Sequence, residues 1–578
     1  MWVTLFRRFT PVAGPYWNSE TKWQVRGLTA ALIALTIGQI GIVMALNLWI
    51  LNFFDALENR AMDKFMALIG AIALIIAANI AVTVVHLAVK RRLQVGSRRW
   101  LTHRLLGEWM SRGHHHKVTF FPGEHDNPDG RIAEDIRIAT ETAIDLAHSL
   151  FHAMLLLGSF ATVLWTLSGS PHLEIAGVPL YVPGHLVWIA VLYSIAGALI
   201  AWLLGHPLVA AQNRRQTFEA NFRFGLARAR EHSLQIALMQ GDGNEGHNLR
   251  GLFRGAAKAW NNQTRALVNL FYFTAAWWVL SQVFPIMVAA PRYFAGVITL
   301  GVLMQTAQAF QQMVGALSWP VDNMINVAGW RASVERVLGL YDALGRIGER
   351  RSSESGRIIR IDRGDEPALV FDEVSIASPG GGLAMKPFSA RLGPGQRILI
   401  SGNSDVAFKF LKATAGLWPW GSGRVILPGT GPLFFVPRRP YLPLRSLRAI
   451  VAYPDPPQQF PDSAIAAALT RVGLGHLLPE LDKSGRWDET LSGDEQQRLG
   501  FARLLLFRPK WLFIQEALDV LTPTARKDML RILDDQFSDA AIVIIGREPE
   551  LSALATHRME FADDGAVEMR PVRREQAL

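Results

Sequence analysis

The segment from Ser401 to Gly423, SGNSDVAFKFLKATAGLWPWGSG, has the layout of a phosphate-binding loop without its chemistry. Upstream, RLGPGQRILI predicts a strand that runs into this glycine-containing turn, and the second half of the segment predicts the helix that follows such a loop. A phosphate-binding loop reads G-x-x-x-x-G-K-[ST], because backbone N–H groups wrap the phosphates, the lysine pairs with them and the hydroxyl holds Mg²⁺. The segment does not contain this pattern.

Two alignments of the segment lead to the same result. Anchored on Gly402, the lysine position holds Phe408 and the second glycine is Ala407. Anchored on the downstream AGLWP, one residue is missing and the lysine position holds Ala407, while Lys409 lies nearby but off the expected position. Losing a charge-assisted phosphate contact costs about 1.5–3 kcal/mol. The bulk of Phe408 and the negative charge of Asp405 also oppose a polyphosphate.

A second set of polar residues lies in an apolar stretch further upstream. Four glutamines in LMQTAQAFQQ occur at i, i+3, i+6 and i+7, which places their amides on one helical face: Gln305, Gln308, Gln311 and Gln312. Amides that face lipid are costly. We therefore expect this face to line a wet cavity, with a contact between helices as the alternative.

A third set combines a carboxylate with two imidazoles. His148 and His152 share one face of an expected membrane helix, and Asp145 lies one turn before them. Ionisable residues within membrane helices often mark proton relays, which is one interpretation of this cluster. Helix packing, or a place at the membrane edge, is the other.

The composition indicates a membrane protein with a soluble part. Of its 578 residues, 50% are hydrophobic and 19% are charged, and the mean hydropathy is +0.17. The formal charge of +10 fits basic cytoplasmic loops better than nucleic-acid binding, because no base-reading motif occurs. The chain has no cysteine, which excludes disulfides, thiolate metal sites and cysteine nucleophiles, and we expect no metal site.

Six apolar segments have about the 20 residues that a membrane-spanning helix needs. They are Leu28–Leu51, Phe65–Val89, Ala147–Leu167, Leu186–Leu204, Leu267–Ala289 and Val297–Val314. Loop 168–185 has no lysine or arginine, whereas loops 90–146 and 205–266 are rich in both. The positive-inside rule therefore predicts that both long loops and both termini are cytoplasmic. Both long loops have helical periodicity, so we expect helices that continue past the membrane and turn back, with ordinary solvated loops as the alternative.

The composition changes after the last span, where an Arg/Ser/Gly-rich run indicates a linker. Short strand-like runs, turns and helices then alternate, which predicts an α/β domain large enough for its own core. The expected organisation is an interfacial N-terminal segment, a transmembrane domain with long cytoplasmic helical extensions, a linker and the α/β domain, at residues 1–26, 27–345, 346–357 and 358–578.

The order of motifs in the α/β domain resembles the nucleotide-binding domain of an ABC transporter. The strand and glycine turn are followed by LFFVPRRPYLPLRSLRAIVAYP, by LSGDEQQRLGFARLLLFRPKWLFIQEALDVL and by AIVIIGRE. Within that family, EHDNPDGRIAEDIR, PRYFAGVITLGVLMQTAQAF and AGLWPWGSG resemble the branch that holds SbmA/BacA-like peptide uptake proteins and the peroxisomal fatty-acyl transporters. The resemblance extends from about Pro15 to Met569. It implies a polytopic α-helical membrane domain of six transmembrane helices, like that of type IV ABC exporters, followed by an α/β ABC ATPase-like domain.

The departures from the family's motifs predict that this domain has lost hydrolysis. The Walker B aspartate is replaced by Gln515, while Glu516, the expected general base, survives and is idle in this interpretation. Arg438 replaces the Q-loop glutamine, Arg547 the switch histidine and Thr522 the D-loop aspartate, and Asp494 replaces the second glycine of the signature. That aspartate would point at the γ-phosphate held by a partner subunit. The degenerate site then comprises Gly402, Ser404, Ala407, Phe408, Lys409, Arg438, Ser492, Gly493, Asp494, Gln515 and Arg547.

The resemblance implies a dimeric transporter of the bacterial inner membrane that takes up peptides or other hydrophilic solutes. With hydrolysis lost, a proton gradient is the expected energy source. The resemblance implies this because SbmA/BacA-like proteins lack the ATPase domain and look proton-driven. We expect no bound Mg²⁺. ATP held without magnesium by Arg438 and Arg547 is the alternative. A heterodimer with an ATPase-competent partner chain and a non-transporting membrane sensor remain as other functions. Substrate and transport direction stay open.

Overall fold

The structure is a computed structural model that describes residues 2–120, 127–169, 172–175, 178–181, 183–353, 358–379, 381–429, 431, 433–546 and 550–572. The chain forms two compact units. The helical unit comprises Met1–Gly107 and Glu124–Tyr341, and the sheet unit comprises Glu108–Gly123 and Asp342–Leu578. The short segment 108–123 therefore belongs with the C-terminal part of the chain.

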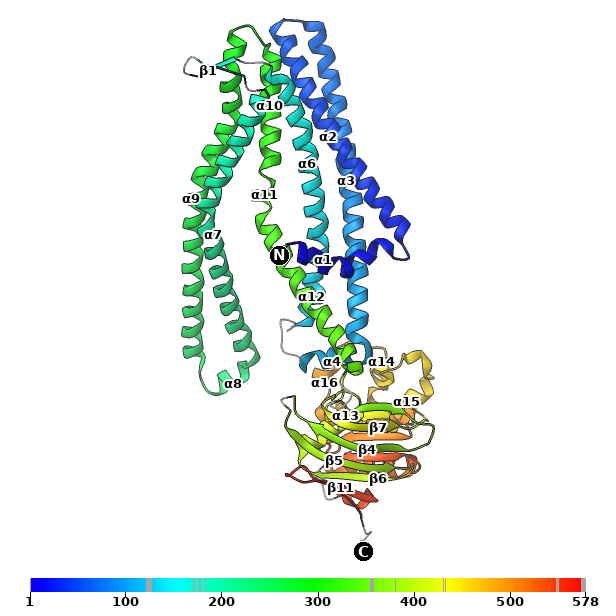
Figure 1. Cartoon of the computed structure of the whole chain (residues 1–578). Helices are drawn as coiled ribbons and strands as arrows, with labels where there is room; N and C mark the ends of the chain where they lie inside the picture. The colour runs from blue at the N-terminus through cyan, green and yellow to red at the C-terminus, as the bar shows by residue number, and fades with distance from the viewer. Residues whose placement is uncertain are drawn as a thin grey trace. The chain divides into compact units, whose positions relative to one another are not determined.

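Long helices dominate the helical unit (Figure 1). They are α1 (Trp2–Ala13), α2 (Lys22–Glu58), α3 (Met62–Met110), α6 (Ala143–Ser168), α7 (His185–Glu231), α9 (Asp242–Phe294), α10 (Leu300–Leu317) and α12 (Met324–Ser353). Short elements connect them: η1 (Gly14–Asn18), α5 (Pro128–Gly130), the π-helical segments η4 (Arg131–Asp135) and η5 (Ile138–Thr142), the strands β1 (His172–Ile175) and β2 (Val178–Tyr181), α8 (Ser233–Leu238) and α11 (Trp319–Asp322).

Five helices of the described chain are long and apolar enough to cross a membrane, and they contain α2, α3, α6, α7 and α9. The expected sixth span, Val297–Val314, overlaps α10, which is not among them. Its four glutamines lower the apolar character of a short helix. The expected count of six spans is therefore not confirmed.

Helices occupy most of the two basic loops. α3 continues to Met110, well past the apolar segment, and α7 and α9 pack side by side as a long hairpin with α8 at its tip (Figure 1). In this hairpin the guanidinium of Arg215 lies 3.9 Å over the ring of Trp260 and donates to Gln263 Oε1 at 2.9 Å. The helical periodicity of these loops thus predicted helices correctly: α3, α7 and α9 all continue into them.

The beginning of α10 is held by the end of α2. The backbone N–H of Leu300 donates to Glu58 Oε2 and that of Gly301 donates to Asp55 Oδ1, both at 2.9 Å. Carboxylates are favoured at a helix N-terminus, because its first N–H groups have no partner within the helix and the helix dipole is positive there. A Cβ on Gly301 would lie 2.2 Å from the carbonyl oxygen of Leu51, so only glycine permits this approach.

A buried carboxylate joins the π-helical segment η4 to α12. Asp135 is 4% exposed and accepts hydrogen bonds from Arg131 at 3.1 Å and from Arg336 Nε at 2.9 Å. Burial alone would raise the pKa of Asp135, but the hydrogen bonds from Arg336, Ser333 and Arg131 hold it below its usual value. The pair therefore stabilises the fold at neutral pH, and this contribution is lost as the carboxylate protonates in acid.

Two sheets and the helices around them make up the sheet unit. A six-stranded sheet has the order β12-β11-β6-β10-β9-β8, and a four-stranded sheet has the order β3-β7-β4-β5. The first contains β6 (Arg397–Gly402), β8 (Leu433–Val436), β9 (Trp511–Gln515), β10 (Ala541–Ile545), β11 (His557–Phe561) and β12 (Val567–Pro571), and only β12 is antiparallel to its neighbour. The second contains β3 (Arg360–Arg363), β4 (Leu369–Ala377), β5 (Leu383–Leu392) and β7 (Gly421–Leu427).

The helices of the sheet unit are short apart from α13, α17 and α18. They are η2 (Ser111–Gly113), α4 (His114–Lys117), η3 (Val118–Phe120), α13 (Ser404–Thr414), α14 (Leu447–Ala452), η6 (Pro457–Gln459), α15 (Asp462–Arg471), η7 (Gly475–Glu480), α16 (Trp487–Thr490), α17 (Gly493–Phe507), α18 (Pro523–Gln536) and α19 (Glu550–Leu554). α12 runs to Ser353, through the first part of the linker expected at 346–357.

The central strands are buried on both faces, as parallel strands covered by other layers must be. In β9, Trp511 and Phe513 join the core that contains β4 and α13, whereas Leu512 and Ile514 join the core that contains α14, α15 and α17. This alternation follows the two-residue period of a strand. The helix α13 therefore lies between the two sheets, and its apolar face packs into the core that they share.

We predict that Gly301→Ala destabilises the helical unit. The new methyl group must displace the backbone of α2 or shift the start of α10, and overpacking of this kind costs about 1–3 kcal/mol. Thermal unfolding of the purified full-length protein in detergent, followed by tryptophan fluorescence, should show a lower Tm.

The matched control is Gly315→Ala in the same helix, where an added Cβ meets no atom within 4 Å. Equal Tm values for the Gly301 variant and the wild type would contradict the proposed contact between α2 and α10.

Candidate functional site

A single residue connects β6 to α13. β6 ends at Gly402, Asn403 caps the helix, and α13 begins at Ser404. Gly402 has a φ of +95°, and an added Cβ would lie 2.1 Å from the carbonyl oxygen of Phe561, so this glycine serves the close approach of β11. A phosphate-binding loop needs several residues between strand and helix whose N–H groups surround the anion. This connection is too short to form one.

The side chain of Asn403 occupies the position that an anion would take. Its Oδ1 accepts hydrogen bonds from the backbone N–H groups of Asp405 at 3.2 Å and Val406 at 3.3 Å. Free N–H groups at a helix N-terminus are what attracts phosphate. Here the amide oxygen takes two of them, so the start of α13 has an internal cap.

Of the other expected positions on α13, two are apolar and the third is a lysine that is paired with a carboxylate. Ala407 is 2% exposed and belongs to the core between the sheets, and Phe408 is partly buried against the same core. Lys409 forms an ion pair with Asp405 at 2.5 Å, and the ammonium of Lys412 lies 4.1 Å over the ring of Phe408. Burial lowers the pKa of Lys412. Lys409 and Lys412 are thus engaged within the helix itself.

A cavity of about 460 Å³ remains at the carboxyl ends of β6, β9 and β10. Its polar lining includes one carboxylate, Glu516, and one guanidinium, Arg558, whose Nη2 donates to Ser552 Oγ at 2.9 Å. Among the described lining residues these two charges balance, so this part of the cavity offers no excess of positive charge to a triphosphate. Residues at the expected nucleotide site also line it: Gly402, Ser404 and Ala407.

The residue at the general-base position is ion-paired. Glu516 directly follows β9 and Gln515, its backbone N–H donates to Ile545 O at 2.7 Å, and its Oε2 lies 3.4 Å from Arg438 Nη1. Arg438 stands where the Q-loop glutamine is expected. A general base must be within hydrogen-bond reach of the proton that it takes. An exposed pair of this kind adds little stability, but it engages the carboxylate.

The arginine expected at the switch position, Arg547, lies outside the described residues. An anion site built from Arg438 and Arg547 therefore stays a prediction. In the described part, Arg438 is already engaged by Glu516.

The signature residues form a helix cap. Ser492 Oγ accepts from the backbone N–H of Glu495 at 3.3 Å, while Glu495 Oε2 accepts from the backbone N–H and the hydroxyl of Ser492 at 3.0 and 2.8 Å. This reciprocal arrangement is a capping box for α17, which begins at Gly493. The hydrogen bonds from Ser492 lower the pKa of Glu495.

Asp494 makes its contacts within its own chain. The sequence had led us to expect that it would face a phosphate held by a partner subunit. Its Oδ1 accepts from the backbone N–H of Thr522 at 2.9 Å and from the Thr522 hydroxyl at 3.2 Å, and its Oδ2 lies 2.7 Å from Arg498 Nε. Thr522 is the residue at the D-loop aspartate position. The two substituted positions therefore bind each other and join α17 to the start of α18.

An aromatic contact that the sequence did not predict lies within the sheet unit. The ring of Phe120, in segment 108–123, lies 5.4 Å from the ring of Trp418 and 4.9 Å from that of Trp420, both edge to face. His116 packs on the same ring at 4.9 Å, and burial, with Lys412 adding to it, lowers the pKa of His116. The tryptophans of AGLWPWGSG thus hold this segment to the four-stranded sheet and α13.

The first two glutamines of the expected cavity face form a helix contact instead. Gln305 is 5% exposed, and its Nε2 donates to Asn47 Oδ1 at 3.0 Å. Asn47 Nδ2 in turn donates to the backbone oxygen of Gln305 at 3.2 Å and to Gln308 Oε1. Polar side chains inside a membrane are stabilised by such partners on a neighbouring helix. Cavity lining is therefore wrong for Gln305, because α2 covers it.

The other two glutamines are less buried. Gln311 Nε2 donates to Gln282 Oε1 of α9 at 2.8 Å, and Gln312 is half-buried. For Gln312, cavity lining stays a prediction.

The structure adds two residues to the cluster of Asp145, His148 and His152. His148 Nε2 lies 2.8 Å from His86 Nε2 of α3, and Asp145 forms an ion pair with Lys90 of α3 at 3.0 Å. The ring centroids of His148 and His152 are 6.3 Å apart. The sequence showed His86 and Lys90 four residues apart on an apolar helix, but it could not show which helix they contact.

Comparisons with known proteins agree with this fold. Residues 15–294 match the family described as ABC transporter transmembrane region 2. The chain is 25% identical over 557 residues to the inner membrane ABC transporter ATP-binding protein YddA of Escherichia coli, covering 95% of this chain and 96% of that protein. It is 29% identical to the ABC transporter D family member 2, chloroplastic, of Arabidopsis thaliana, covering 90% and 81% of the two chains.

A solved structure has the same fold over nearly the whole chain. It is the structure of a bacterial Atm1-family ABC exporter with ATP bound, with a TM-score of 0.71, 16% identity and 95% coverage of both chains. The chain therefore has the organisation of an ABC half-transporter, in which a membrane region with several apolar helices is fused to a domain of the ABC ATPase fold.

Proposed function

We propose that this half-transporter takes up peptides or other hydrophilic solutes across the bacterial inner membrane as a homodimer, with a proton gradient in place of ATP as its energy source. The resemblance to SbmA/BacA-like uptake proteins supports the solute class and the direction. The observation that carries the proposal is the one-residue connection between β6 and α13, capped by Asn403. Without the loop, the domain has no cradle for a triphosphate.

Three further features support the loss of hydrolysis. Gln515 replaces the carboxylate that a hard cation such as Mg²⁺ requires, Glu516 is paired with Arg438, and Asp494 is bonded to Thr522. We infer that the sheet unit now serves as a structural scaffold for the dimer.

The heterodimer is the runner-up, because Glu516 and the mostly intact signature could complete one working site with an ATPase-competent partner chain. Against it stands the capping box, in which the Ser492 hydroxyl is already bonded to Glu495. Co-purification of a second ABC chain from the native membrane would favour the heterodimer.

Nucleotide binding is the first test. We expect radiolabelled ATP to show no saturable binding to the purified full-length protein up to millimolar concentration, with or without Mg²⁺, because the phosphate donors at α13 are absent or engaged. Equilibrium dialysis in detergent measures this, and an ATP-binding ABC transporter prepared in the same way is the positive control. Saturable, magnesium-dependent binding at micromolar ATP would contradict the proposal.

A second prediction concerns Glu516. We expect Glu516→Gln to leave the uptake of a fluorescently labelled hydrophilic peptide within about twofold of the wild type, whereas loss of a true general base typically lowers a catalysed step by about 10²–10⁴-fold. Uptake is measured in energised cells with protein levels matched by immunoblot.

The same cells supply the energetic test. A protonophore should abolish peptide uptake while the cellular ATP concentration is held constant. Uptake that survives the protonophore and is lost in Glu516→Gln would overturn the proposed energy source. Absence of accumulation under every condition, together with a stable cytoplasmic partner, would indicate a membrane sensor.

A further inference from the structure

Two histidines from different helices meet at the contact between α3 and α6. His86 Nε2 and His148 Nε2 are 2.8 Å apart, and their ring centroids are 4.5 Å apart. His86 is 7% exposed, so the contact lies away from solvent. We name this pair the histidine dyad.

The chemistry of imidazole limits what the dyad can hold. A neutral ring has one N–H and one nitrogen lone pair, whereas a protonated ring has two N–H groups and no acceptor. A hydrogen bond between two Nε2 atoms therefore exists when both rings are neutral or when one of them is protonated. Two protonated rings would face each other with donors only and with like charges. The dyad can thus bind a single additional proton while the contact between the helices is kept.

His86 of the dyad lies at one end of a row of polar residues on α3, which we name the polar stripe. Residues at four-residue spacing, Arg98, Gln94, Lys90 and His86, lie on one face of that helix. Gln94 Nε2 donates to the backbone oxygen of Glu141 at 3.1 Å, and Arg98 Nη1 lies 3.4 Å from Glu141 Oε1. Each member thus meets a partner on η5 or α6, in the order in which the two elements run past each other.

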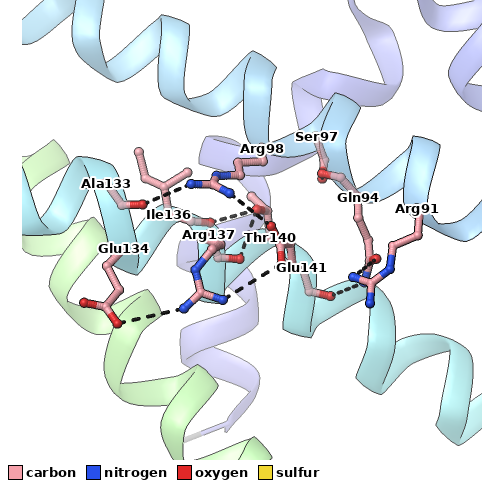
Figure 2. Close-up of polar contacts among 10 residues, drawn as sticks. All are labelled: Arg91, Gln94, Ser97, Arg98, Ala133, Glu134, Ile136, Arg137, Thr140 and Glu141. Atoms are coloured by element: carbon pink, nitrogen blue, oxygen red, sulfur yellow. Dashed lines mark hydrogen bonds and ion pairs between the residues drawn. The ribbon is translucent and has the colours of Figure 1, made fainter.

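Figure 2 shows the part of the stripe furthest from the dyad. Arg98 Nη2 also donates to the backbone oxygen of Ala133 at 3.4 Å, and Arg137 lies 4.0 Å from Glu141 Oε2. These partners belong to the π-helical segments η4 and η5 or the residues between them, where the wider helix changes the backbone hydrogen bonds. Arg98 and Arg137 are 42% exposed, so this end of the stripe is in contact with water.

The charges around the dyad are balanced. Lys90 and Asp145 lie one turn from His86 and His148 and form an ion pair at 3.0 Å, and His152 lies one turn further along α6. The helices α10, α2 and α7 also pack against α6. α10 carries no charged residue or histidine. α2 carries no such residue between Arg26 and Asp55, and α7 carries none between His185 and His206.

One more element reaches this region. α11 contacts Ser149 of α6 through Trp319 Nε1 at 3.0 Å, and it carries Asp322. Protonation of the dyad therefore changes the net charge of a site that is otherwise neutral across α3 and α6.

We propose that the histidine dyad, His86 with His148, is the proton-binding site of the transporter and exchanges its proton with water. The proposal rests on the proton coupling proposed above. A proton from water adds to the free lone pair of the dyad, which becomes one imidazolium bonded to one neutral imidazole. Its release restores two neutral rings, so no other reactant is consumed. His152 is the next acceptor toward the apolar part of α6.

The test uses variants that keep the helix contact but cannot titrate. The glutamine amide nitrogen can occupy the place of the histidine Nε2, so His86→Gln, His148→Gln and the double variant can retain a hydrogen bond between α3 and α6. The matched control is His206→Gln in α7, a histidine outside the stripe. The full-length proteins are reconstituted into liposomes that contain a pH-sensitive dye.

Two transport modes are measured with the same fluorescently labelled hydrophilic peptide. One is uptake driven by an imposed inward proton gradient, together with acidification of the lumen. The other is exchange of labelled for unlabelled peptide without any gradient. For the dyad variants we expect gradient-driven uptake to fall at least tenfold and to lose its dependence on pH, while exchange stays within about twofold of the wild type. The control variant should match the wild type in both modes.

Each other outcome overturns a definite claim. Dyad variants with gradient-driven uptake and the wild-type pH profile would refute the dyad as the proton site and leave the proposed function standing. Dyad variants that lose exchange as well as uptake would show that the histidines are structural, which also refutes it. A wild type that exchanges peptide but ignores the proton gradient would refute the proton-coupled function, and the dyad proposal with it.

Discussion

The hydrogen bonds that Asn403 makes with the start of α13 are the constraint on which the sheet unit depends. With one residue between β6 and the helix, the first N–H groups of α13 are satisfied inside the chain, at 3.2 and 3.3 Å from Asn403 Oδ1. An N-terminal cap contributes about 0.5–2 kcal/mol to a helix. A phosphate loop satisfies the same donors with its ligand. At the start of α13 these donors are instead satisfied by a side chain of the protein itself, so this contact needs no ligand.

Internal partners also occupy two other places in the domain. Arg438 pairs with Glu516, and Asp494 binds Thr522, so that substituted positions engage each other or a retained residue. The apolar segments of the domain form its buried core. α13 buries Val406, Phe410 and Leu411 between the sheets, and the central strands are buried on both faces. Gln515 ends β9 and Arg438 follows β8, and neither belongs to the buried core.

The sequence predicted much of this fold and less of its contacts. Hydropathy predicted the apolar helices, and the order of motifs predicted the α/β domain, because both depend on local patterns. Pairing between distant segments has no such pattern. Phe120 is one of several aromatic residues in a basic loop, and nothing in that loop indicates the tryptophans at 418 and 420. Periodicity grouped the four glutamines, but it could not show that Gln305 pairs with Asn47, which lies about 260 residues away in the chain.

The polar contacts of the helical unit follow from the cost of burying such groups in apolar surroundings. Polar groups join two helices at three places: Asn47 with Gln305, the histidine dyad, and the carboxylates of α2 at the start of α10. Between apolar helices in lipid, packing alone selects a partner weakly, whereas an unsatisfied polar group costs several kcal/mol. Asn47 and Gln305 carry no titratable group. The dyad is different because its charge can change while its hydrogen bond persists, which is what a site that drives transport must be able to do.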